Sequence, residues 1–215
     1  MVFAAALAPA GWLAWAAYNG NLSPDPLADI THGTGDWTLR FLCITLAITP
    51  LRRLTGWNAF IRFRRMAGLF AFFYGSLHFL IYMLADRLAS LVEFPDGVVS
   101  LDTAQRLLAS IWADVAMRLY ITVGFTALVL MLPLAITSTA GWIRRLGGKK
   151  WQALHRLVYV SAILGVIHYW WLVKADIRDP AMYAAIVAGL LGFRLYQSRR
   201  RAGRAPAQVH MTAES

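Results

Sequence analysis

Three histidines lie in stretches of the chain that are otherwise apolar. His78 is within "MAGLFAFFYGSLHFLIYML", and His155 and His168 are within "ALHRLVYVSAILGVIHYWW". An imidazole is costly in hydrocarbon, so an ionisable side chain in such a stretch is a functional candidate by default. Neutral imidazole is also the commonest metal ligand among side chains. These residues in this setting are therefore candidates for binding a metal or a metal-containing group.

The composition is typical of a membrane protein. Of the 215 residues, 59% are hydrophobic and 15% are charged, whereas soluble domains are roughly half apolar and a quarter charged. Six apolar runs approach the ~20 residues that a helix needs to cross ~30 Å of hydrocarbon. The expected fold is an all-α membrane protein, a six-helix transmembrane bundle. Its helices are predicted at residues 1–18, 37–54, 66–84, 119–137, 152–173 and 180–196.

The chain is expected to form one transmembrane domain over residues 1–198. A basic tail at residues 199–215 is expected to be disordered, and a short surface helix is predicted at residues 101–115. Cys43 is the single cysteine, which excludes an intramolecular disulfide and a cysteine-rich zinc or iron–sulfur site.

The charged residues are divided unevenly between the two ends of the predicted helices. Ten of the 11 Asp and Glu residues lie on one side, and fifteen of the 21 Lys and Arg residues lie on the other. Because the Lys/Arg bias sets the orientation of membrane helices, both termini are expected in the cytoplasm. The basic residues would anchor helix ends at lipid headgroups, so no nucleic-acid partner is expected. They are Arg52, Arg53, Arg62, Arg64, Arg65, Arg144, Arg145, Lys149, Lys150, Arg156, Arg194, Arg199, Arg200, Arg201 and Arg204.

His78 and His168 are expected at similar depth in the membrane. His78 lies thirteen residues after the cytoplasmic entry at Arg65, or ~20 Å along a helix. His168 lies sixteen residues after the entry at Gln152, or ~24 Å. His155 lies only about one turn inside the cytoplasmic edge, and no ligand at the start of the helix at 66–84 matches it.

Two interpretations of these histidines stay open at this point. A single histidine can serve as a hydrogen-bonding contact between helices, whereas two at matched depth on different helices favour a shared ligand. Zinc would need a third or fourth ligand, which is missing at that level. A flat tetrapyrrole needs only two axial ligands and apolar walls, and bis-histidine iron suits electron transfer. For His155 alone, ligation and a structural contact are equally open.

The spacing of the later two histidines raises a geometrical problem. Thirteen residues amount to 3.6 turns, so His155 and His168 point ~140° apart on an ideal helix. Both can face the helix at 66–84 only if a distortion such as a π-bulge intervenes; otherwise His155 faces a different partner. His32, in a predicted outer loop, is expected to be structural or exposed, and His210 lies in the tail.

Several stretches together resemble the ferric-reductase-like transmembrane family, which includes the NADPH oxidases. They are "ITHGTGDWTLRFL", "ITPLRRLTGW", "RFRRMAGLFAFFYGSLHFLIY", "YITVGFTALVLMLPLAITSTAGWIRRLGGKKWQALHRLVY" and "IHYWWLVKAD". Within that family, they are most similar to the haem-binding membrane subunits of bacterial periplasmic methionine-sulfoxide reductase systems. The resemblance covers most of residues 25–176.

The resemblance implies haem b bound through His78, His155 and His168, and an FMN associated with the subunit. Electrons would come from the quinone pool or from a cytoplasmic flavin reductase. They would pass to a periplasmic molybdopterin-containing subunit that reduces methionine sulfoxide in oxidised proteins. The expected role is that of an oxidoreductase electron-transfer subunit of the bacterial inner membrane, without substrate catalysis of its own.

The chain departs from the larger oxidases in one respect. They carry two histidines on each of two helices and hold two haems, whereas the helix at 66–84 has only His78. With His78 and His168 as axial ligands of the iron, His155 is left for a second haem or as an alternative ligand. A fused NADPH and FAD domain is expected to be absent. Arg40 and Arg118 lie near outer helix ends, and one of them is expected to pair with a haem propionate.

Two other functions fit the same residues. A self-contained metal reductase would share the haem but deliver electrons to extracellular iron or copper. A non-redox transporter would use the histidines as structural contacts and bind no chromophore. Transporters tend to show inverted repeats and broken helices; neither is evident, although Pro133 could kink its helix. The basic segment at residues 134–151 is either a surface for the donor or flavin, or only a topogenic loop.

Overall fold

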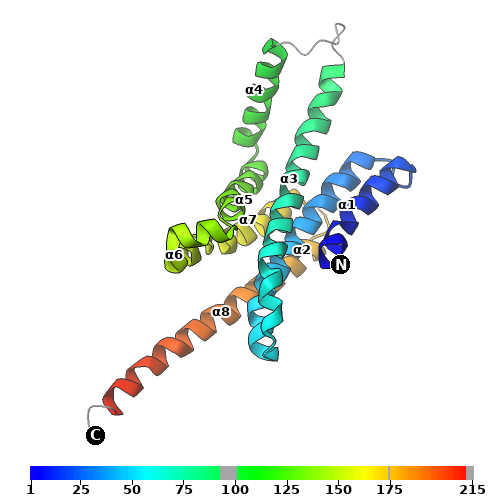
Figure 1. Cartoon of the computed structure of the whole chain (residues 1–215). Helices are drawn as coiled ribbons and strands as arrows, with labels where there is room; N and C mark the ends of the chain where they lie inside the picture. The colour runs from blue at the N-terminus through cyan, green and yellow to red at the C-terminus, as the bar shows by residue number, and fades with distance from the viewer. Residues whose placement is uncertain (93–100, 174, 212–215) are drawn as a thin grey trace.

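The computed structural model describes residues 1–92, 101–173 and 175–211, and every regular element in these ranges is a helix (Figure 1). The all-α fold expected from the sequence is therefore confirmed there. Two described stretches are long and apolar enough by themselves to cross a membrane, Asn58–Met83 and Leu119–Ile136. The count of six transmembrane helices stays a prediction. The helices are α1 (Val2–Tyr18), α2 (Pro26–Thr55), the 3₁₀ turn η1 (Asn58–Phe60), α3 (Ile61–Val92), α4 (Leu101–Met117), α5 (Leu119–Ile136), α6 (Ala140–Leu154), α7 (Leu157–Leu172) and α8 (Arg178–Met211).

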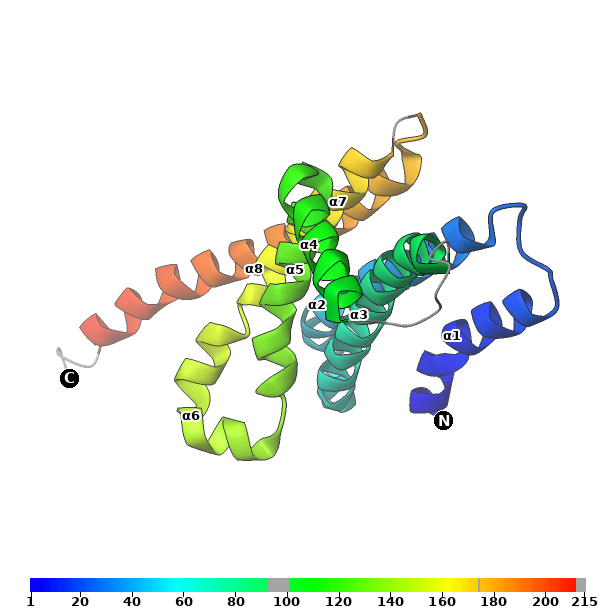
Figure 2. The ribbon, with the colours of Figure 1, turned by 90° about the horizontal axis from the view of Figure 1, so that it is seen from above.

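Two helix pairs form the centre of the molecule. The most extensive packing is between α2 and α3 and between α5 and α7. Helix α8 packs against α2 and α7, and α1 contacts α2. In Figures 1 and 2 the C-terminal part of α8 extends away from the other helices. The main core includes Leu46, Ala71, Tyr74 and Ala162, all fully buried or nearly so. The small side chains of Ala71 and Ala162 let neighbouring helices approach closely.

The connector between α3 and α5 contains the predicted surface helix. Helix α4 (Leu101–Met117) covers the residues where the sequence predicts it. It joins α3 and α5 through a second apolar cluster formed by Met83, Val115 and Ile121. This cluster holds the N-terminal end of α5 in place, next to the site described below.

The basic connector after α5 forms a helix that the sequence did not predict. The Thr139 hydroxyl caps α6 by accepting a hydrogen bond from the backbone N–H of Trp142. Gly147, with φ of +71°, interrupts the helix. The chain breaks again at His155 and Arg156 before α7 begins. The predicted single helix at 152–173 is therefore wrong, because its first turn belongs to α6.

Helix α8 continues past residue 199, where the sequence predicts a disordered basic tail. Its described backbone is helical to Met211. The division into a domain at 1–198 and a tail at 199–215 stays a prediction.

Arg194 on α8 compensates for a proline in α2. Pro50 has no N–H, so the carbonyl of Leu46, one turn earlier, lacks its usual helical donor. Arg194 donates from Nη2 to that carbonyl at 2.7 Å and from Nη1 to the Tyr159 hydroxyl at 2.9 Å. One guanidinium thus ties α8 to both α2 and α7.

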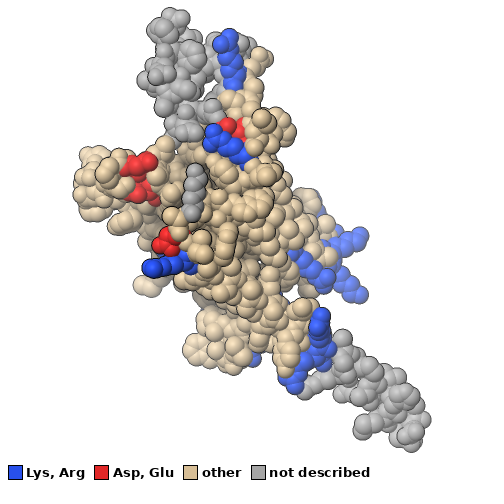
Figure 3. Space-filling model, turned by 180° about the vertical axis from the view of Figure 1, so that it is seen from behind, with Lys and Arg blue, Asp and Glu red and all other residues tan. Residues whose placement is uncertain are grey.

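On the face drawn in Figure 3, the larger groups of Lys and Arg lie away from the Asp and Glu side chains, and single basic side chains lie beside the acidic ones. In Figure 3, the Asp and Glu side chains lie toward the upper left, and the largest groups of Lys and Arg lie at the right and lower edges. This arrangement agrees with the division of charge along the sequence. The cytoplasmic assignment of the basic end stays a prediction.

Candidate functional site

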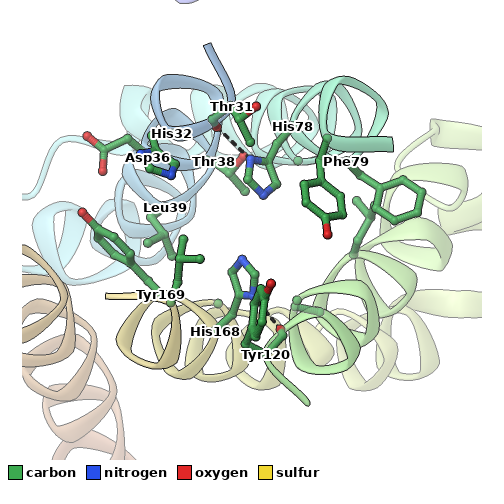
Figure 4. A pocket seen from close by; sticks show the side chains of 18 of the residues that line it. Thr31, His32, Asp36, Thr38, Leu39, His78, Phe79, Tyr120, His168 and Tyr169 are labelled. Carbon is green, nitrogen blue, oxygen red and sulfur yellow. Dashed lines mark hydrogen bonds between the residues drawn. The ribbon is translucent and has the colours of Figure 1, made fainter. Parts of the chain in front are cut away.

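His78 and His168 face each other across a cavity of about 640 Å³. His78 projects from α3 and His168 from α7, and their ring centroids lie 6.1 Å apart with the planes nearly perpendicular, at 79° (Figure 4). Residues of α2, α3, α5, α7 and the start of α8 line the cavity. The two histidines that the sequence placed at one depth thus come together.

Each of these rings is oriented by a backbone carbonyl of another helix. His78 Nδ1 lies 2.8 Å from the carbonyl oxygen of Thr31, and His168 Nδ1 lies 2.6 Å from that of Tyr120. A carbonyl only accepts, so Nδ1 carries the proton in both rings. The lone pair is then on Nε2. Fixing the tautomer through the second nitrogen is how proteins prepare a histidine for ligation.

Each bonded carbonyl is followed one turn later by a glycine. Gly35 follows Thr31 in α2, and a Cβ there would lie 3.1 Å from His78 Nδ1. Gly124 follows Tyr120 in α5, and a Cβ there would lie 2.7 Å from the Nδ1 atom of the other histidine. Helical Cβ atoms point toward the N-terminus and cover the preceding turn. The glycines therefore leave both carbonyls open.

The inner walls of the cavity are apolar and its rim is polar. Leu42, Phe79, Leu128 and Met131 are among the wall residues. One buried polar side chain, Ser161, also lines the wall. The rim carries His32, Asp36, Tyr120, Tyr169 and Asp179.

Arg40 belongs to a polar network beside the rim. Its Nη2 lies 2.6 Å from an Asp36 carboxylate oxygen, and its Nε donates to the Tyr183 hydroxyl at 3.2 Å. The guanidinium also lies over the Trp37 ring, 4.7 Å from its centroid. Arg40 does not itself line the cavity but reaches it through Asp36.

Arg118, at the junction of α4 and α5, lies near the cavity as Arg40 does, on the opposite side of it. It lies 3.7 Å from Asp114 and 3.5 Å from the Tyr120 hydroxyl. Its hydrogen bond to Tyr120 joins it to a residue that lines the cavity. The structure thus puts both predicted arginines one residue away from the cavity wall.

His155 lies apart from the other two histidines. It ends α6, and its ring stacks on Trp151 at 3.9 Å between centroids. Its Nε2 lies 3.1 Å from the Thr137 hydroxyl, which already donates its proton to the carbonyl of Pro133 at 2.6 Å. The hydroxyl therefore accepts from His155, and Nε2 carries the proton. No π-bulge in residues 140–172 brings His155 onto the face of His168; the chain breaks at residues 155 and 156, and His155 faces a different partner, Thr137.

His32 is the residue that reasoning from the sequence undervalued. It was expected to be structural or exposed; its ring is exposed, but it also lines the rim of the cavity (Figure 4). The glycines at 35 and 124 were missed as well. Each glycine lies four residues after the residue whose carbonyl accepts a hydrogen bond from a histidine. Because that hydrogen bond joins distant segments, the sequence gives no sign of it.

The cavity fits a flat macrocycle that carries a metal. A metal–imidazole bond is about 2 Å long, so two rings sharing one metal through Nε2 hold their centroids roughly 6 Å apart. The observed 6.1 Å agrees. In the described residues, no group of three or more His, Cys, Asp or Glu side chains could hold a metal ion alone. The remaining ligands would come from the bound group, and the volume is within the range of cofactor sites.

Comparison with known proteins identifies a family. The family model described as "Ferric reductase like transmembrane component" matches residues 34–166. These residues include His78 of the cavity and His155, and they end two residues before His168. No solved structure matches the chain.

Curated relatives match most of the chain. A protein of Herminiimonas arsenicoxydans is 50% identical over 198 residues, 91% of this chain and 83% of the relative. A protein of Xanthomonas oryzae pv. oryzae (strain MAFF 311018) is 46% identical over 221 residues, 99% of this chain and 93% of the relative. A protein of Ralstonia nicotianae is 53% identical over 174 residues, 80% and 72% respectively. Each is named "Protein-methionine-sulfoxide reductase heme-binding subunit MsrQ".

Proposed function

The chain belongs to the ferric-reductase-like transmembrane family and, within it, to the MsrQ group, and we propose that it carries electrons through a haem b bound between His78 and His168. One observation supports this most: two imidazoles on different helices face each other at 6.1 Å, each with its Nδ1 proton on a backbone carbonyl. The relatives' name supplies the identity of the bound group.

The residues of the site suit electron transfer rather than substrate chemistry. When bound, haem supplies a one-electron redox centre. His78 and His168 would hold the haem iron, and with both imidazoles bound it would leave no position for a substrate. The carbonyls of Thr31 and Tyr120 hold the rings, and the apolar walls exclude water from them.

The proposed acceptor is a periplasmic molybdopterin-containing methionine-sulfoxide reductase subunit. The relatives' name, which makes them subunits of such a reductase, supports this step. Two acidic residues, Asp36 and Asp179, line the cavity. The charge bias predicts the side that carries the acidic residues to be the periplasm.

The proposed electron donor is taken from the resemblance to the family. The quinone pool or a cytoplasmic flavin reductase is proposed as donor, and an FMN as an additional cofactor. The basic helix α6 would offer a surface for either. One of Arg40 and Arg118 is proposed to reach a haem propionate, because each touches a rim residue.

His155 is proposed to have a different role from the axial pair. Its Nε2 proton is held by Thr137, and its ring is covered by Trp151. Ligation of a second haem through Nε2 would require this hydrogen bond to break. An interhelical contact at the inner end of α5 accounts for the same contacts.

A dithionite-reduced minus oxidised absorption spectrum of the purified protein tests the proposal. We expect a b-type α-band in the wild type, its loss in His78→Gly and His168→Gly, and its partial return with added imidazole. His155→Ala is the matched control and should keep the band. A colourless wild type, produced with haem in excess, would contradict the proposal and favour structural histidines.

A second experiment, the reoxidation of reduced protein, distinguishes the proposed acceptor from free metal ions. Reduced protein should be reoxidised by the partner reductase with methionine sulfoxide, and only slowly by ferric chelates. Faster reoxidation by the chelates would instead support a self-contained metal reductase.

A further inference from the structure

His32 is the residue with which the cavity can meet a negative charge. No lysine or arginine is among the described residues that line the cavity. His78 and His168 have their Nδ1 protons on backbone carbonyls, which leaves their Nε2 atoms for the metal. Apart from this pair, His32 is the lining side chain in the described ranges that can become a cation.

The His32 ring is available to a ligand. It is exposed, and its nitrogens make no hydrogen bond within the part of the chain that the structure describes. Figure 4 shows it at the α2 edge of the cavity beside Asp36, with Tyr169 of α7 across from them. An imidazole donates one N–H when neutral and two when protonated, so it can bind an acceptor in either state.

The carboxylates of the chain near His32 are each stabilised by another group. Asp36 accepts from Arg40 at 2.6 Å. Asp179 lies in the first turn of α8, where the positive end of the helix dipole stabilises a carboxylate. Asp29, three residues before His32, accepts a backbone N–H of the preceding loop at 2.7 Å. The imidazole is therefore left for an acceptor from outside the chain.

A haem would bring such an acceptor into this cavity. Its macrocycle is apolar except at one edge, which carries two propionate carboxylates. The inner walls, with residues such as Leu42, Leu128 and Met131, offer a carboxylate no charged partner. Burying an unpaired carboxylate is costly, so the propionate edge has to lie at the polar rim. Of the rim residues named above, His32 is the one that can carry a positive charge.

We propose that the His32 imidazole donates a hydrogen bond to one haem propionate. This inference rests on the proposed function, because it takes haem to be the occupant. The second propionate is left to Arg40 or Arg118, neither of which lines the cavity. A hydrogen bond to a carboxylate is charge-assisted, so it holds the haem and offsets a negative charge near the iron. Since reduction adds an electron to the haem, losing this bond disfavours the reduced form.

Haem release and midpoint potential of the purified holoprotein test the role of His32. His32→Ala should keep the b-type α-band, have a more negative potential, and release haem to apomyoglobin roughly threefold to tenfold faster. His32→Arg supplies a permanent cation and should return both values toward the wild type. Arg178→Ala is the control, because it removes a positive charge next to Asp179 of the rim without lining the cavity itself, and it should change neither value.

Haem dimethyl ester, in which both propionates are esterified, separates the proposed contact from a structural effect of the substitution. In protein reconstituted with the ester, wild type and His32→Ala should release it at the same rate, because the ester has no carboxylate for the imidazole to bind. A difference as large as that seen with haem would assign the effect of His32→Ala to the fold.

The role of His32 would also be overturned by wild-type release and potential in His32→Ala, by equal changes in Arg178→Ala, or by no recovery in His32→Arg. Each of these results leaves the proposed function intact, since the α-band would still be present. A wild-type protein without an α-band would overturn both proposals together.

Discussion

The Nδ1 atom of His168 occupies a position where a Cβ atom on Gly124 would be only 2.7 Å away. The ring can bond the carbonyl of Tyr120 because the residue one turn later has no side chain. Gly35 gives His78 the same access on α2, at the looser distance of 3.1 Å. Both proposed axial ligands are thus oriented by a carbonyl that a glycine uncovers.

Gly124→Ala is expected to reduce haem retention at least tenfold. A heavy-atom approach of 2.7 Å requires the ring to move, and its neighbouring atoms Cε1 and Cγ are nearly as close, at 2.9 and 3.0 Å. Gly35→Ala should have a smaller effect, because its nearest contact is 3.1 Å. Haem-to-protein ratio after purification measures both.

Gly189→Ala is the control for these substitutions. Nothing lies within 4 Å of a Cβ at residue 189, in the middle of α8. Alanine is favoured over glycine in a helix by roughly 0.5–1 kcal/mol, so this variant should keep its haem and be slightly more stable. Equal haem loss in all three variants would contradict a specific role for Gly124.

Arg194→Leu is expected to lower the free energy of unfolding by about 1–3 kcal/mol, because it leaves the Leu46 carbonyl and the Tyr159 hydroxyl without a charged donor. Pro50→Ala supplies an N–H for that carbonyl, so Arg194→Leu should cost less in the Pro50→Ala background. A double-mutant cycle on detergent-solubilised protein measures the coupling, which we expect at about 0.5–1.5 kcal/mol.

Pro133→Ala provides the matched comparison for this cycle. Pro133 lies in α5 and takes no part in the contacts of Arg194. Its effect should therefore add to that of Arg194→Leu. Additivity in both cycles would show that Arg194 does not compensate for Pro50.

Tyr74→Phe is expected to loosen α1. The Tyr74 hydroxyl donates to the carbonyl of Ala6 at 2.8 Å and accepts from the backbone N–H of Ala10 at 3.2 Å. The hydroxyl lies between this carbonyl and this N–H, which would otherwise form a hydrogen bond with each other within α1, next to Pro9. Because Tyr74 is fully buried, losing the hydroxyl should cost about 1–3 kcal/mol. Faster proteolysis within α1, with the α-band retained, is the expected readout; an unchanged cleavage rate would refute it.

The turn before α2 should open in acid. The Asp29 carboxylate accepts the backbone N–H of Ser23 at 2.7 Å, which lowers the pKa of Asp29 from its usual 3.8. A lowered folded-state pKa means that the stabilisation is present above pH 3.8 and is lost as the pH falls through the folded value. As the pH falls through this range, the Ser23 amide hydrogen should lose its protection, so that its exchange rate approaches the intrinsic rate at the same pH. Asp29→Asn should abolish this pH dependence.

The residue types and their order along the chain determined the helical class and the candidate ligands. Long apolar runs predict helices, because only helices satisfy their own backbone in lipid. The helical rise of 1.5 Å placed His78 and His168 at one depth. Depth requires only distances along a single helix, which is why it could be obtained from the sequence.

Tertiary structure alone decided what each histidine meets. The carbonyls of Thr31 and Tyr120, the glycines that uncover them, and the separate bond of His155 to Thr137 all join segments far apart in the chain. The break between α6 and α7 also depended on packing, since the residues around it read as a continuous apolar helix. The rotation of a helix about its axis and the identity of its neighbours are set by contacts between helices. A local sequence pattern therefore cannot predict either of them.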